Sequence, residues 1–319
     1  MFSRIRIAIL IPCYNEAATV GTVVLDFHKC LPQADIYVYD NNSRDETARR
    51  AAEAGAIVRR EAQQGKGNVV RRMLRDVEAD VYVLVDGDDT YDAAAAPDMV
   101  RMLLEENLAM VVGRRVHQHA DAYRPGHVLG NKMFTSAVDR LFGRTFTDIL
   151  SGYRVFSRRF AKSFPLASSA FEVETELSVH ALTLKLPVAE VDTVYKVRPA
   201  GSVSKLETYR DGFRILYRIV QLFRSERPQL FYSTIGFFLL FISAVLAYPL
   251  VVTFLKTGLV PRFPTAILAT GTALSGLLSF SNGFILDTVT QGRREAKHLA
   301  YLATPALGNR PVARTPGGQ

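Results

Sequence analysis

The sequence predicts an α/β domain with a mostly parallel sheet covered by helices on both faces, followed by a two-helix transmembrane hairpin. Up to about residue 115, short apolar segments alternate with helical segments, which is typical of repeated βα units. Further along, Pro228–Leu255 and Phe263–Leu286 contain no charged side chain. Each segment can cross a bilayer core of about 30 Å at about 1.5 Å per residue. Two buried core helices are the alternative, but uncharged segments this long are rare in soluble domains.

The predicted elements follow one another in the order expected for βα units. The expected strands are short and apolar: Ile5–Ile11, Ile36–Tyr39, Ala56–Val58, Val81–Val85 and Ala109–Val112. The expected helices lie between them: Ala17–Phe27, Arg44–Ala54, Asn68–Val77 and Pro97–Glu106. The stretch from Arg115 to Pro125 is polar and irregular, and we expect it to be a loop.

Polar side chains cluster where three of these strands end. Asn15-Glu16 follow the first strand, Asp40-Asn41-Asn42 follow the second, and the acidic segment Asp86–Asp92 follows the fourth. Ligands of open parallel sheets bind at the carboxyl ends of the strands, so we expect these clusters to form one site. The carboxylates of the acidic segment repel one another unless a cation or hydrogen bonds balance them. Mg²⁺ and Mn²⁺ take one or two carboxylates and leave other positions to water and phosphate. A solvated acidic turn is the alternative for an isolated Asp-x-Asp.

The distribution of charge indicates a membrane surface. The net charge is +8, and 48% of the residues are hydrophobic. Cations flank the two apolar segments: Arg210, Arg214, Arg218, Arg224 and Arg227 before the first, and Arg293, Arg294 and Lys297 after the second. The connecting turn carries only Lys256 and Arg262, so the positive-inside rule places both ends of the hairpin in the cytoplasm. No nucleic-acid motif accompanies the positive charge, and nucleic acid is not an expected partner.

Four regions are expected along the chain: residues 1–205 as a cytoplasmic domain, 206–227 as a basic amphipathic helix, 228–290 as a hairpin with spans at about 230–255 and 263–286, and 291–319 as a partly disordered cytoplasmic tail. The amphipathic helix is expected in the membrane interface, and docking on the cytoplasmic domain is the alternative. Small residues in the second span permit close packing, either within the hairpin or between protomers of a homo-oligomer. Cys13 and Cys30 lack metal-binding spacing and are interpreted as reduced and structural.

Five motifs occur in order along the first part of the chain: Ile11-Pro12-Cys13-Tyr14-Asn15-Glu16, Asp40-Asn41-Asn42-Ser43-Arg44-Asp45, Gly65-Lys66-Gly67-Asn68, Asp86-x-Asp88 and Ser151-Gly152-Tyr153-Arg154. Together they resemble the family 2 glycosyltransferases. More narrowly, they are similar to the polyprenyl-phosphate branch, typified by dolichyl-phosphate mannose synthase and bacterial undecaprenyl-phosphate sugar transferases. The resemblance covers residues 5–206, and the hairpin matches the membrane-bound members. It implies a GT-A type, Rossmann-like fold for the α/β domain.

The resemblance also implies roles for individual residues. The donor nucleotide sugar would be bound by Pro12, Tyr14, Glu16, Asp40, Lys66 and Asp86. Asp88 and Asp148 are the implied catalytic residues: Asp88, with Asp86, would hold Mg²⁺ or Mn²⁺ at the donor phosphates, and Asp148 would face the transferred sugar. The acceptor phosphate would be contacted by Arg115, Arg124 and Lys205. Thr90 stands where some relatives have a glutamine ligand, which leaves the second metal ligand open.

The implied reaction is a metal-dependent, inverting transfer of a sugar from a nucleotide sugar to polyprenyl phosphate, for modification of cell-envelope glycan or lipopolysaccharide. A UDP-sugar is favoured over a GDP-sugar, and the sequence does not indicate the sugar. The expected location is the inner (cytoplasmic) membrane, with several spans and a cytoplasmic catalytic domain. The alternatives are a membrane-anchored glycosyltransferase with a different acceptor and a non-catalytic nucleotide-binding membrane scaffold. A processive polysaccharide synthase is disfavoured because the chain has no tryptophan and so lacks that group's Gln-x-x-Arg-Trp motif.

Overall fold

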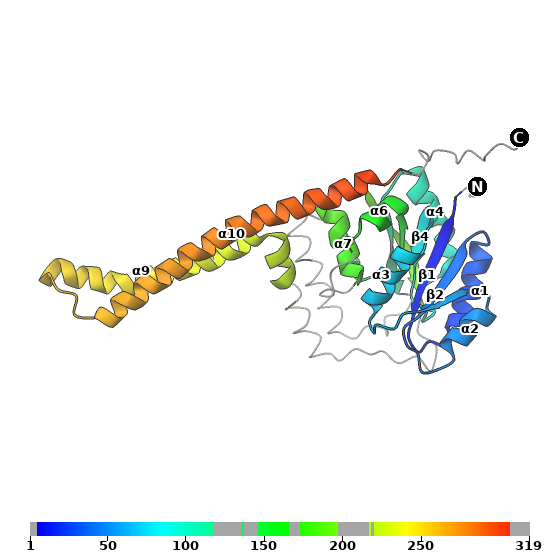
Figure 1. The fold of residues 1–319 in the computed structure, drawn as a ribbon, viewed down its shortest axis with the longest axis horizontal. Coiled ribbons are helices and arrows are strands. Elements are labelled where there is room, and N and C mark those ends of the chain that lie inside the picture. Colours follow the sequence, from blue (N-terminus) through cyan, green and yellow to red (C-terminus); the bar gives the residue numbers. More distant parts are fainter. Residues whose placement is uncertain are drawn as a thin grey trace, which may run out of the picture. The chain divides into compact units, whose positions relative to one another are not determined.

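The computed structural model describes residues 5–117, 136, 146–165, 173–196, 217 and 220–306. Two compact units divide the chain. The sheet unit comprises Met1–Gly212 and Ala296–Gln319, and the hairpin unit comprises Phe213–Glu295. The strands and most of the helices in Figure 1 belong to the sheet unit.

The sheet unit is built on one seven-stranded sheet with the strand order β3-β2-β1-β4-β6-β5-β7. The strands are β1 (Ile7–Cys13), β2 (Asp35–Asp40), β3 (Ile57–Arg60), β4 (Val81–Leu84), β5 (Met110–His117), β6 (Arg154–Ser157) and β7 (Val188–Tyr195). All neighbouring strands are parallel except β6, which is antiparallel to both β4 and β5. The predicted mostly parallel sheet is therefore confirmed.

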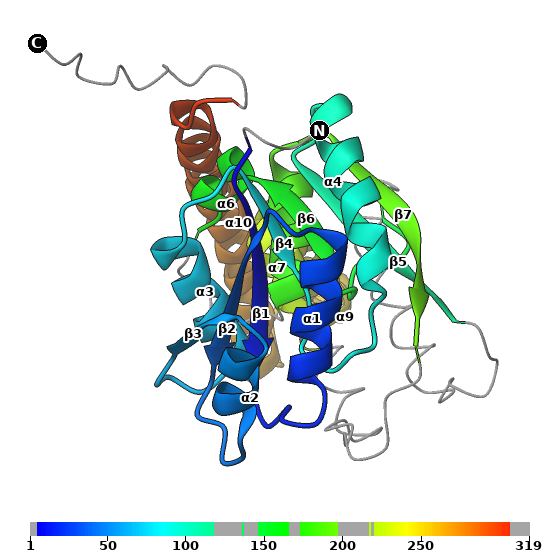
Figure 2. The same ribbon diagram turned by 90° about the vertical axis from the view of Figure 1, so that its right-hand side faces the viewer.

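Helices cover both faces of this sheet. They are α1 (Val20–Cys30), α2 (Thr47–Glu53), α3 (Lys66–Asp76), α4 (Ala96–Glu105), α6 (Arg158–Ser163) and α7 (Val173–Thr183). Helix α1 contacts α2 and α4, whereas α3 contacts α6 and α7, and Figure 2 shows α1 and α3 on opposite sides of the sheet. The central strands are thus covered twice, and Ile9, Leu10 and Val83 have no exposed surface. This double burial explains why β1 and β4 have uninterrupted apolar sequences.

Strand β5 extends further than the sequence predicts. It runs to His117, whereas the polarity of the chain from Arg115 onward predicts a loop. The strand pairs with β7 along its whole length. Arg114 of β5 also forms two hydrogen bonds to Asp192 of β7, Nε to Oδ1 at 2.5 Å and Nη2 to Oδ2 at 2.7 Å. The expectation of a loop is wrong for residues 115–117, because pairing with β7, which is distant in sequence, stabilises their extended backbone.

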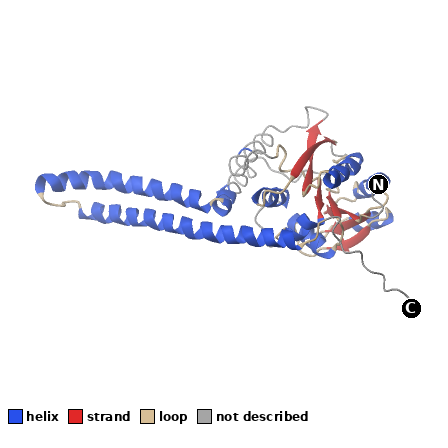
Figure 3. Ribbon diagram, turned by 90° about the horizontal axis from the view of Figure 1, so that it is seen from above, coloured by secondary structure: helices blue, strands red, loops and turns tan. Residues whose placement is uncertain are grey.

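Two long apolar helices dominate the hairpin unit. Helix α9 spans Pro228–Thr257 and helix α10 begins at Phe263 and ends at Ala303, with mean hydropathies of 2.5 and 1.4. They run side by side in opposite directions (Figure 3). Both are long and apolar enough to cross a membrane, which gives the chain the candidate transmembrane hairpin expected from the sequence.

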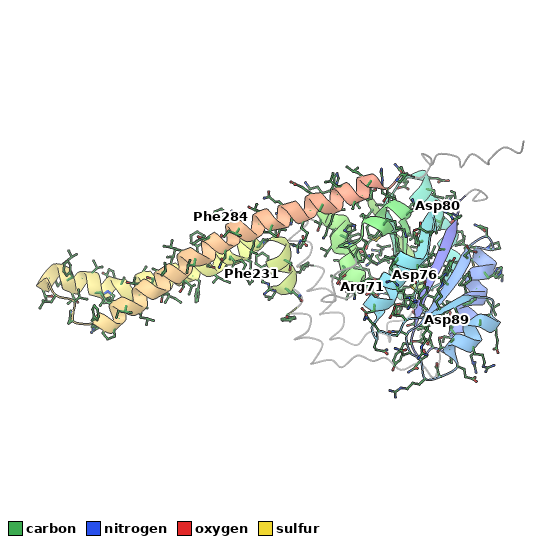
Figure 4. All side chains as sticks on the ribbon, viewed as in Figure 1. Arg71, Asp76, Asp80, Asp89, Phe231 and Phe284 are labelled. Carbon is green, nitrogen blue, oxygen red and sulfur yellow. The ribbon has the colours of Figure 1, made fainter. Side chains whose placement is uncertain are left out.

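Small residues allow α9 and α10 to approach closely. A Cβ atom at Gly236 would lie 2.8 Å from the ring of Phe280 and 3.0 Å from the carbonyl oxygen of Gly276. The hydroxyl of Ser243 donates to the carbonyl oxygen of Ala269 at 2.7 Å. The small residues around Gly276 therefore pack within the hairpin, one of the two arrangements that the sequence allows. Large apolar side chains face outward instead, and Phe284 is 59% exposed (Figure 4).

Arginines that follow the second apolar segment contact the chain that precedes the first. Residues 220–226 are helical, and the carbonyl oxygens of Ser225 and Glu226 accept hydrogen bonds from Arg293 at 3.0 Å and Arg294 at 2.5 Å. Positive charge is favourable at these carbonyls because they end a helix. Most of the predicted amphipathic helix, residues 206–216 and 218–219, lies outside the described residues, as does the end of the predicted tail, 307–319.

Candidate active site

The loops that follow β1 and β2 are joined at the carboxyl edge of the sheet. The backbone N–H of Asn15 donates to Ser43 Oγ at 2.9 Å, and the N–H of Glu16 donates to Thr47 Oγ1 at 2.8 Å. Asp40, the last residue of β2, is 6% exposed and accepts from the N–H of Ser43. Two of the polar clusters expected at strand ends therefore lie together and hold one another in place.

Asn41 fixes the loop that leads into α3. Its amide nitrogen donates to the carbonyl oxygens of Glu61 at 3.0 Å and Gln63 at 2.8 Å, and its amide oxygen accepts from the N–H of Gly65 at 2.7 Å. Gly65 has a φ of 125°, which a residue with a Cβ atom adopts only with strain. This turn makes Lys66 the first residue of α3.

The ammonium group of Lys66 lies between two carboxylates from different elements. It donates one hydrogen bond to Asp86, after the end of β4, and another to Glu174, in the first turn of α7. Burial and the charges of Glu174 and Asp88 raise the pKa of Asp86 despite the opposing effect of Lys66. Burial also acts to raise the pKa of Glu174, but the charge and hydrogen bond of Lys66 outweigh it, and the pKa lies below its usual value. Lys66 therefore links α3, α7 and the acidic segment.

Asp88 is 4% exposed and is oriented by Thr90. The hydroxyl of Thr90 donates to Asp88 Oδ1 at 2.6 Å, and the backbone N–H of Thr90 contacts the same oxygen at 3.3 Å. The hydroxyl of Thr19 holds the carbonyl oxygen of Gly87 at 2.7 Å. Asp89, labelled in Figure 4, has a φ of 53° and accepts from the ammonium of Lys196 at 3.2 Å. The acidic segment is thus a defined loop in which Thr90 orients a carboxylate.

Gly152 brings the Ser-Gly-Tyr-Arg motif against the acidic segment. A Cβ atom at Gly152 would lie 2.5 Å from Asp86 Oδ2, so only a glycine allows this approach. The N–H of Gly152 donates to the hydroxyl of Tyr91 at 2.9 Å. Two motifs that are far apart in the sequence therefore form one surface.

Arg154 of the same motif is a structural residue. It is completely buried, and its guanidinium donates to the carbonyl oxygens of Ser151 at 2.9 Å and Ile149 at 2.6 Å and to the hydroxyl of Ser178 at 2.9 Å. Burial lowers the pKa of Arg154 to about 10, so the side chain keeps its charge at neutral pH. The guanidinium thus fixes the loop before β6 and ties it to α7.

Arg115 and Asp148 form a bidentate ion pair. Arg115 Nε donates to Asp148 Oδ2 at 2.8 Å, and Nη2 donates to Oδ1 at 2.7 Å. Burial acts to raise the pKa of Asp148, but the hydrogen bonds and charge of Arg115 outweigh it and hold the pKa below its usual value. The backbone N–H groups of Thr147 and Asp148 both donate to Glu190 of β7, at 2.9 and 3.0 Å. The guanidinium of Arg115 also lies over the ring of Tyr195, 5.6 Å from its centre.

The acidic segment suits a divalent cation that takes most of its ligands from water and substrate phosphate. In the described part of the chain, no three histidine, cysteine, aspartate or glutamate side chains converge as a metal site. Asp88 and Asp86 offer carboxylate oxygens, the hard donors that Mg²⁺ and Mn²⁺ accept, and these cations routinely keep water and substrate phosphate as further ligands. The donor set therefore suits a cation bound together with a diphosphate.

Comparison with known proteins identifies the family of this chain. The sequence pattern of glycosyl transferase family 2 matches residues 8–164. The chain is also 33% identical over 232 residues to the glycosyltransferase AglJ of Haloferax volcanii, which covers 72% of this chain and 76% of AglJ. The chain belongs to glycosyltransferase family 2. This family 2 glycosyltransferase is further 27% identical over 224 residues to a protein of the same organism named dolichyl-phosphate hexose transferase, with 70% of this chain and 96% of that protein covered.

Solved structures share the fold of this family 2 glycosyltransferase. Glucosyl-3-phosphoglycerate synthase from Mycobacterium tuberculosis, crystallised with Mn²⁺, uridine diphosphate and glucosyl-3-phosphoglycerate, superposes with a TM-score of 0.57. The match covers 70% of this chain and 80% of the synthase at 22% sequence identity. The likeness supports the GT-A type fold expected from the sequence.

The structure brings most of the predicted site residues to one edge of the sheet. Pro12 lies in β1 with Tyr14 directly after it, and both are partly buried. Lys66 contacts Asp86, and Arg115 contacts Asp148. The roles assigned to all of these residues stay predictions. Arg124 and Lys205 lie outside the described residues.

Sequence reasoning missed Glu174 and Glu190, which hold Lys66 and the backbone of Asp148. The available signal for Glu174 was a run of acidic residues at alternating positions, Glu172, Glu174 and Glu176, next to apolar residues. Helix α7 is buried on nearly all sides, so its apolar pattern does not distinguish a site-facing side.

Proposed function

We propose that this glycosyltransferase transfers a sugar, with inversion, from a nucleotide sugar to polyprenyl phosphate. The observation that carries the proposal is that Gly152 joins the Asp86–Asp88 carboxylates to the loop of the Arg115–Asp148 pair, in a chain with a candidate membrane hairpin. A carboxylate site for a metal diphosphate thus adjoins a guanidinium that suits a second phosphate. The relative named dolichyl-phosphate hexose transferase supports a lipid phosphate acceptor, and the synthase crystallised with Mn²⁺ and uridine diphosphate supports a UDP-sugar donor.

On the donor side, we assign nucleoside binding to Pro12, Tyr14, Glu16 and Asp40, which lie at the ends of β1 and β2. Asp88, oriented by Thr90, would hold Mg²⁺ or Mn²⁺ with Asp86 beside it. The cation would offset negative charge on the departing diphosphate. Lys66 and Asp86 would fix the ribose or the sugar, because both retain partly exposed side chains next to the acidic loop.

On the acceptor side, no strong base is needed. A phosphate monoester has a second pKa of about 6, so the attacking oxygen is mostly deprotonated near pH 7. The lowered pKa of Asp148 keeps that carboxylate ionised and paired with Arg115, which suits orientation of Arg115 better than removal of a proton. Catalysis then depends on holding the phosphate oxygen in line with the anomeric carbon and on the charges around the diphosphate.

For location, we propose that α9 and α10 cross the inner membrane and that the sheet unit lies on its cytoplasmic side. The apolar lengths of both helices and the cations at their outer ends support this topology. We also propose that the four regions of the chain meet at residues 205, 227 and 290, as the sequence predicts.

The test is direct transfer by the full-length protein in detergent with Mn²⁺, undecaprenyl phosphate and a panel of UDP- and GDP-sugars. Mass spectrometry of the lipid fraction is expected to find polyprenyl phosphate carrying one added sugar, and NMR is expected to find a β-linkage from an α-linked donor. Absence of a lipid product with every donor, at a protein concentration where Mn²⁺ and UDP bind, would exclude the polyprenyl phosphate acceptor. Transfer to another acceptor would then favour the alternative function, a membrane-anchored glycosyltransferase with a different acceptor.

A further inference from the structure

The donor site predicted from the sequence includes Lys66 and Asp86 but not Glu174, although Glu174 also contacts Lys66. Three elements supply the group: Lys66 begins α3, Asp86 follows β4 and Glu174 lies in the first turn of α7. The side chain of Glu174 is 11% exposed, compared with 33% for Lys66 and 30% for Asp86. Glu174 is therefore the least exposed of the three side chains that form the group.

The location of Lys66 argues against a purely structural ion pair. The N-terminus of a helix carries a partial positive charge, so a lysine at the first position of α3 is disfavoured there. Glu174 has the opposite situation, because an anion is favoured in the first turn of α7. An ion pair selected only to join α3 to α7 would not need a cation at a helix start. The arrangement makes sense if the ammonium must stand beside Asp86.

Glu174 adds to the negative charge that favours a divalent cation beside the acidic segment. Asp86, Asp88 and Glu174 each contribute one negative charge and Lys66 contributes one positive charge, which leaves an excess of two negative charges. In a partly buried site, charges of one sign that are not balanced are costly. Loss of the charge on Glu174 would leave an excess of one negative charge, which attracts a divalent cation less strongly. The ammonium would then bind Asp86 alone.

We propose that Glu174 is a positioning residue that shares the ammonium of Lys66 with Asp86 and so sets the affinity of the Asp86–Asp88 site for the divalent cation. The proposal rests on the proposed function, because it assumes that a cation binds at these carboxylates. Glu174 acts through Lys66: sharing the ammonium between two carboxylates leaves oxygen lone pairs of Asp86 for the cation and for sugar hydroxyls. Without Glu174, the ammonium and the cation compete for the same carboxylate.

The primary experiment measures Mn²⁺ binding by the full-length protein in detergent from the EPR signal of free Mn²⁺, at saturating UDP. Glu174→Gln keeps the size of the side chain and removes its charge, and we expect about tenfold weaker Mn²⁺ binding. Glu174→Asp keeps the charge and is expected to stay within about threefold of the wild type. Glu106→Gln removes one charge at an exposed position after α4 and serves as the matched control, with no change expected. Wild-type Mn²⁺ affinity in Glu174→Gln would overturn the proposal.

A double-mutant cycle tests whether Glu174 acts through Lys66. In a Lys66→Gln background there is no ammonium to position, so Glu174→Gln is expected to change Mn²⁺ affinity by less than about threefold. An equal, tenfold effect in both backgrounds would mean that Glu174 acts on the cation directly, and the positioning role would be wrong. The proposal also requires that a higher Mn²⁺ concentration restores the transfer rate of Glu174→Gln. A merely structural defect would leave the rate low at every Mn²⁺ concentration, which would contradict the proposal.

The result is separable from the proposed function. If the wild type transfers sugar to lipid but Glu174→Gln binds Mn²⁺ normally, the inference about Glu174 fails alone. If the wild type neither binds Mn²⁺ with UDP nor transfers sugar, the proposed function fails and the role of Glu174 fails with it. Circular dichroism melting of each variant checks that it is folded, and Glu174→Asp decides the role of the charge without any change at Lys66.

Discussion

The two sides of the candidate site differ in how their charges are balanced. On the donor side, Lys66 contacts both Asp86 and Glu174, and Asp88 lies close enough to raise the pKa of Asp86. On the acceptor side, the guanidinium of Arg115 and the carboxylate of Asp148 form a one-to-one pair. An excess of negative charge attracts a cation, whereas a neutral pair attracts neither sign strongly. The proposed donor side therefore carries, before any ligand arrives, the excess negative charge that favours a cation.

If Arg115 binds the acceptor phosphate as proposed, its guanidinium must change partner. A phosphate that approaches Arg115 competes with Asp148 for the same guanidinium hydrogens. The cation–π contact with Tyr195 and the bonds from Thr147 and Asp148 to Glu190 keep the pair in place until then. The comparison predicts that substitutions on the donor side weaken metal and nucleotide binding, and that substitutions on the acceptor side weaken binding of the lipid substrate instead.

The largest expected effect comes from Asp88→Asn. The amide oxygen can still accept from Thr90, so the loop and the fold should be kept, but a carboxylate ligand is lost. We expect transfer to fall by at least about 100-fold with the melting temperature nearly unchanged. Asp92→Asn is the control, because Asp92 belongs to the same acidic segment and caps a short helical turn by accepting from the N–H of Ala94. Normal turnover of Asp88→Asn in EDTA-treated membranes would exclude the donor site described here.

Arg115→Met should weaken binding of the acceptor without weakening binding of the donor. Loss of the guanidinium removes two donors that suit phosphate oxygens, and we expect the KM for polyprenyl phosphate to rise about tenfold. The affinity for UDP and Mn²⁺ should not change. Arg114→Met is the matched control on the same strand, because Arg114 forms an exposed ion pair with Asp192 that contributes little. Equal effects of the two variants on the KM would remove Arg115 from the acceptor site.

Gly152→Ala tests the point where the two sides meet. The new methyl group would lie 2.5 Å from Asp86 Oδ2 and must displace that carboxylate or the loop. We expect the KM for the nucleotide sugar to rise several-fold and the free energy of unfolding to fall by about 1–3 kcal/mol. Gly21→Ala places a methyl group where the nearest heavy atom is 3.9 Å away and should cost nothing. An unchanged KM in Gly152→Ala would mean that the position of Asp86 is not critical.

The positions of the proposed donor residues were largely predictable, because these residues lie at or just after the ends of strands that short apolar segments of the sequence indicate. Asp40 and Asp86 come straight after apolar segments, and the rule that ligands bind at the carboxyl ends of parallel strands brings them together. All nine elements expected before residue 115 occur, with bounds shifted by a few residues. The starts of α1 and α3 are shifted because side-chain hydrogen bonds fix the loops that precede these helices, the loop after β1 and the turn at Gly65.

The acceptor side depends on contacts that no local pattern encodes. Strand β6 inserts antiparallel between β4 and β5, and β7 pairs with β5. Glu190 therefore reaches Asp148, and Tyr195 reaches Arg115, across large sequence separations. Motif resemblance identified Asp148 and Arg115 individually, but it did not indicate that they neutralise each other. The sequence left the role of Thr90 open, and the structure shows its hydroxyl donating to Asp88.

The smallest expected effect is the pH dependence of the Arg115–Asp148 pair. Arg115 holds the pKa of Asp148 below its value in the unfolded chain, which is about 3.9. The stability that this pair contributes is therefore fully present above pH 4 to 5 and is lost as the pH falls through the lowered pKa. Asp148→Asn should melt a few degrees below the wild type from pH 7 to pH 5, and the difference should shrink below about pH 4. Circular dichroism melting across this range measures it. A difference that persists unchanged at pH 3 would mean that the carboxylate is stabilised by something other than its ionised pairing with Arg115.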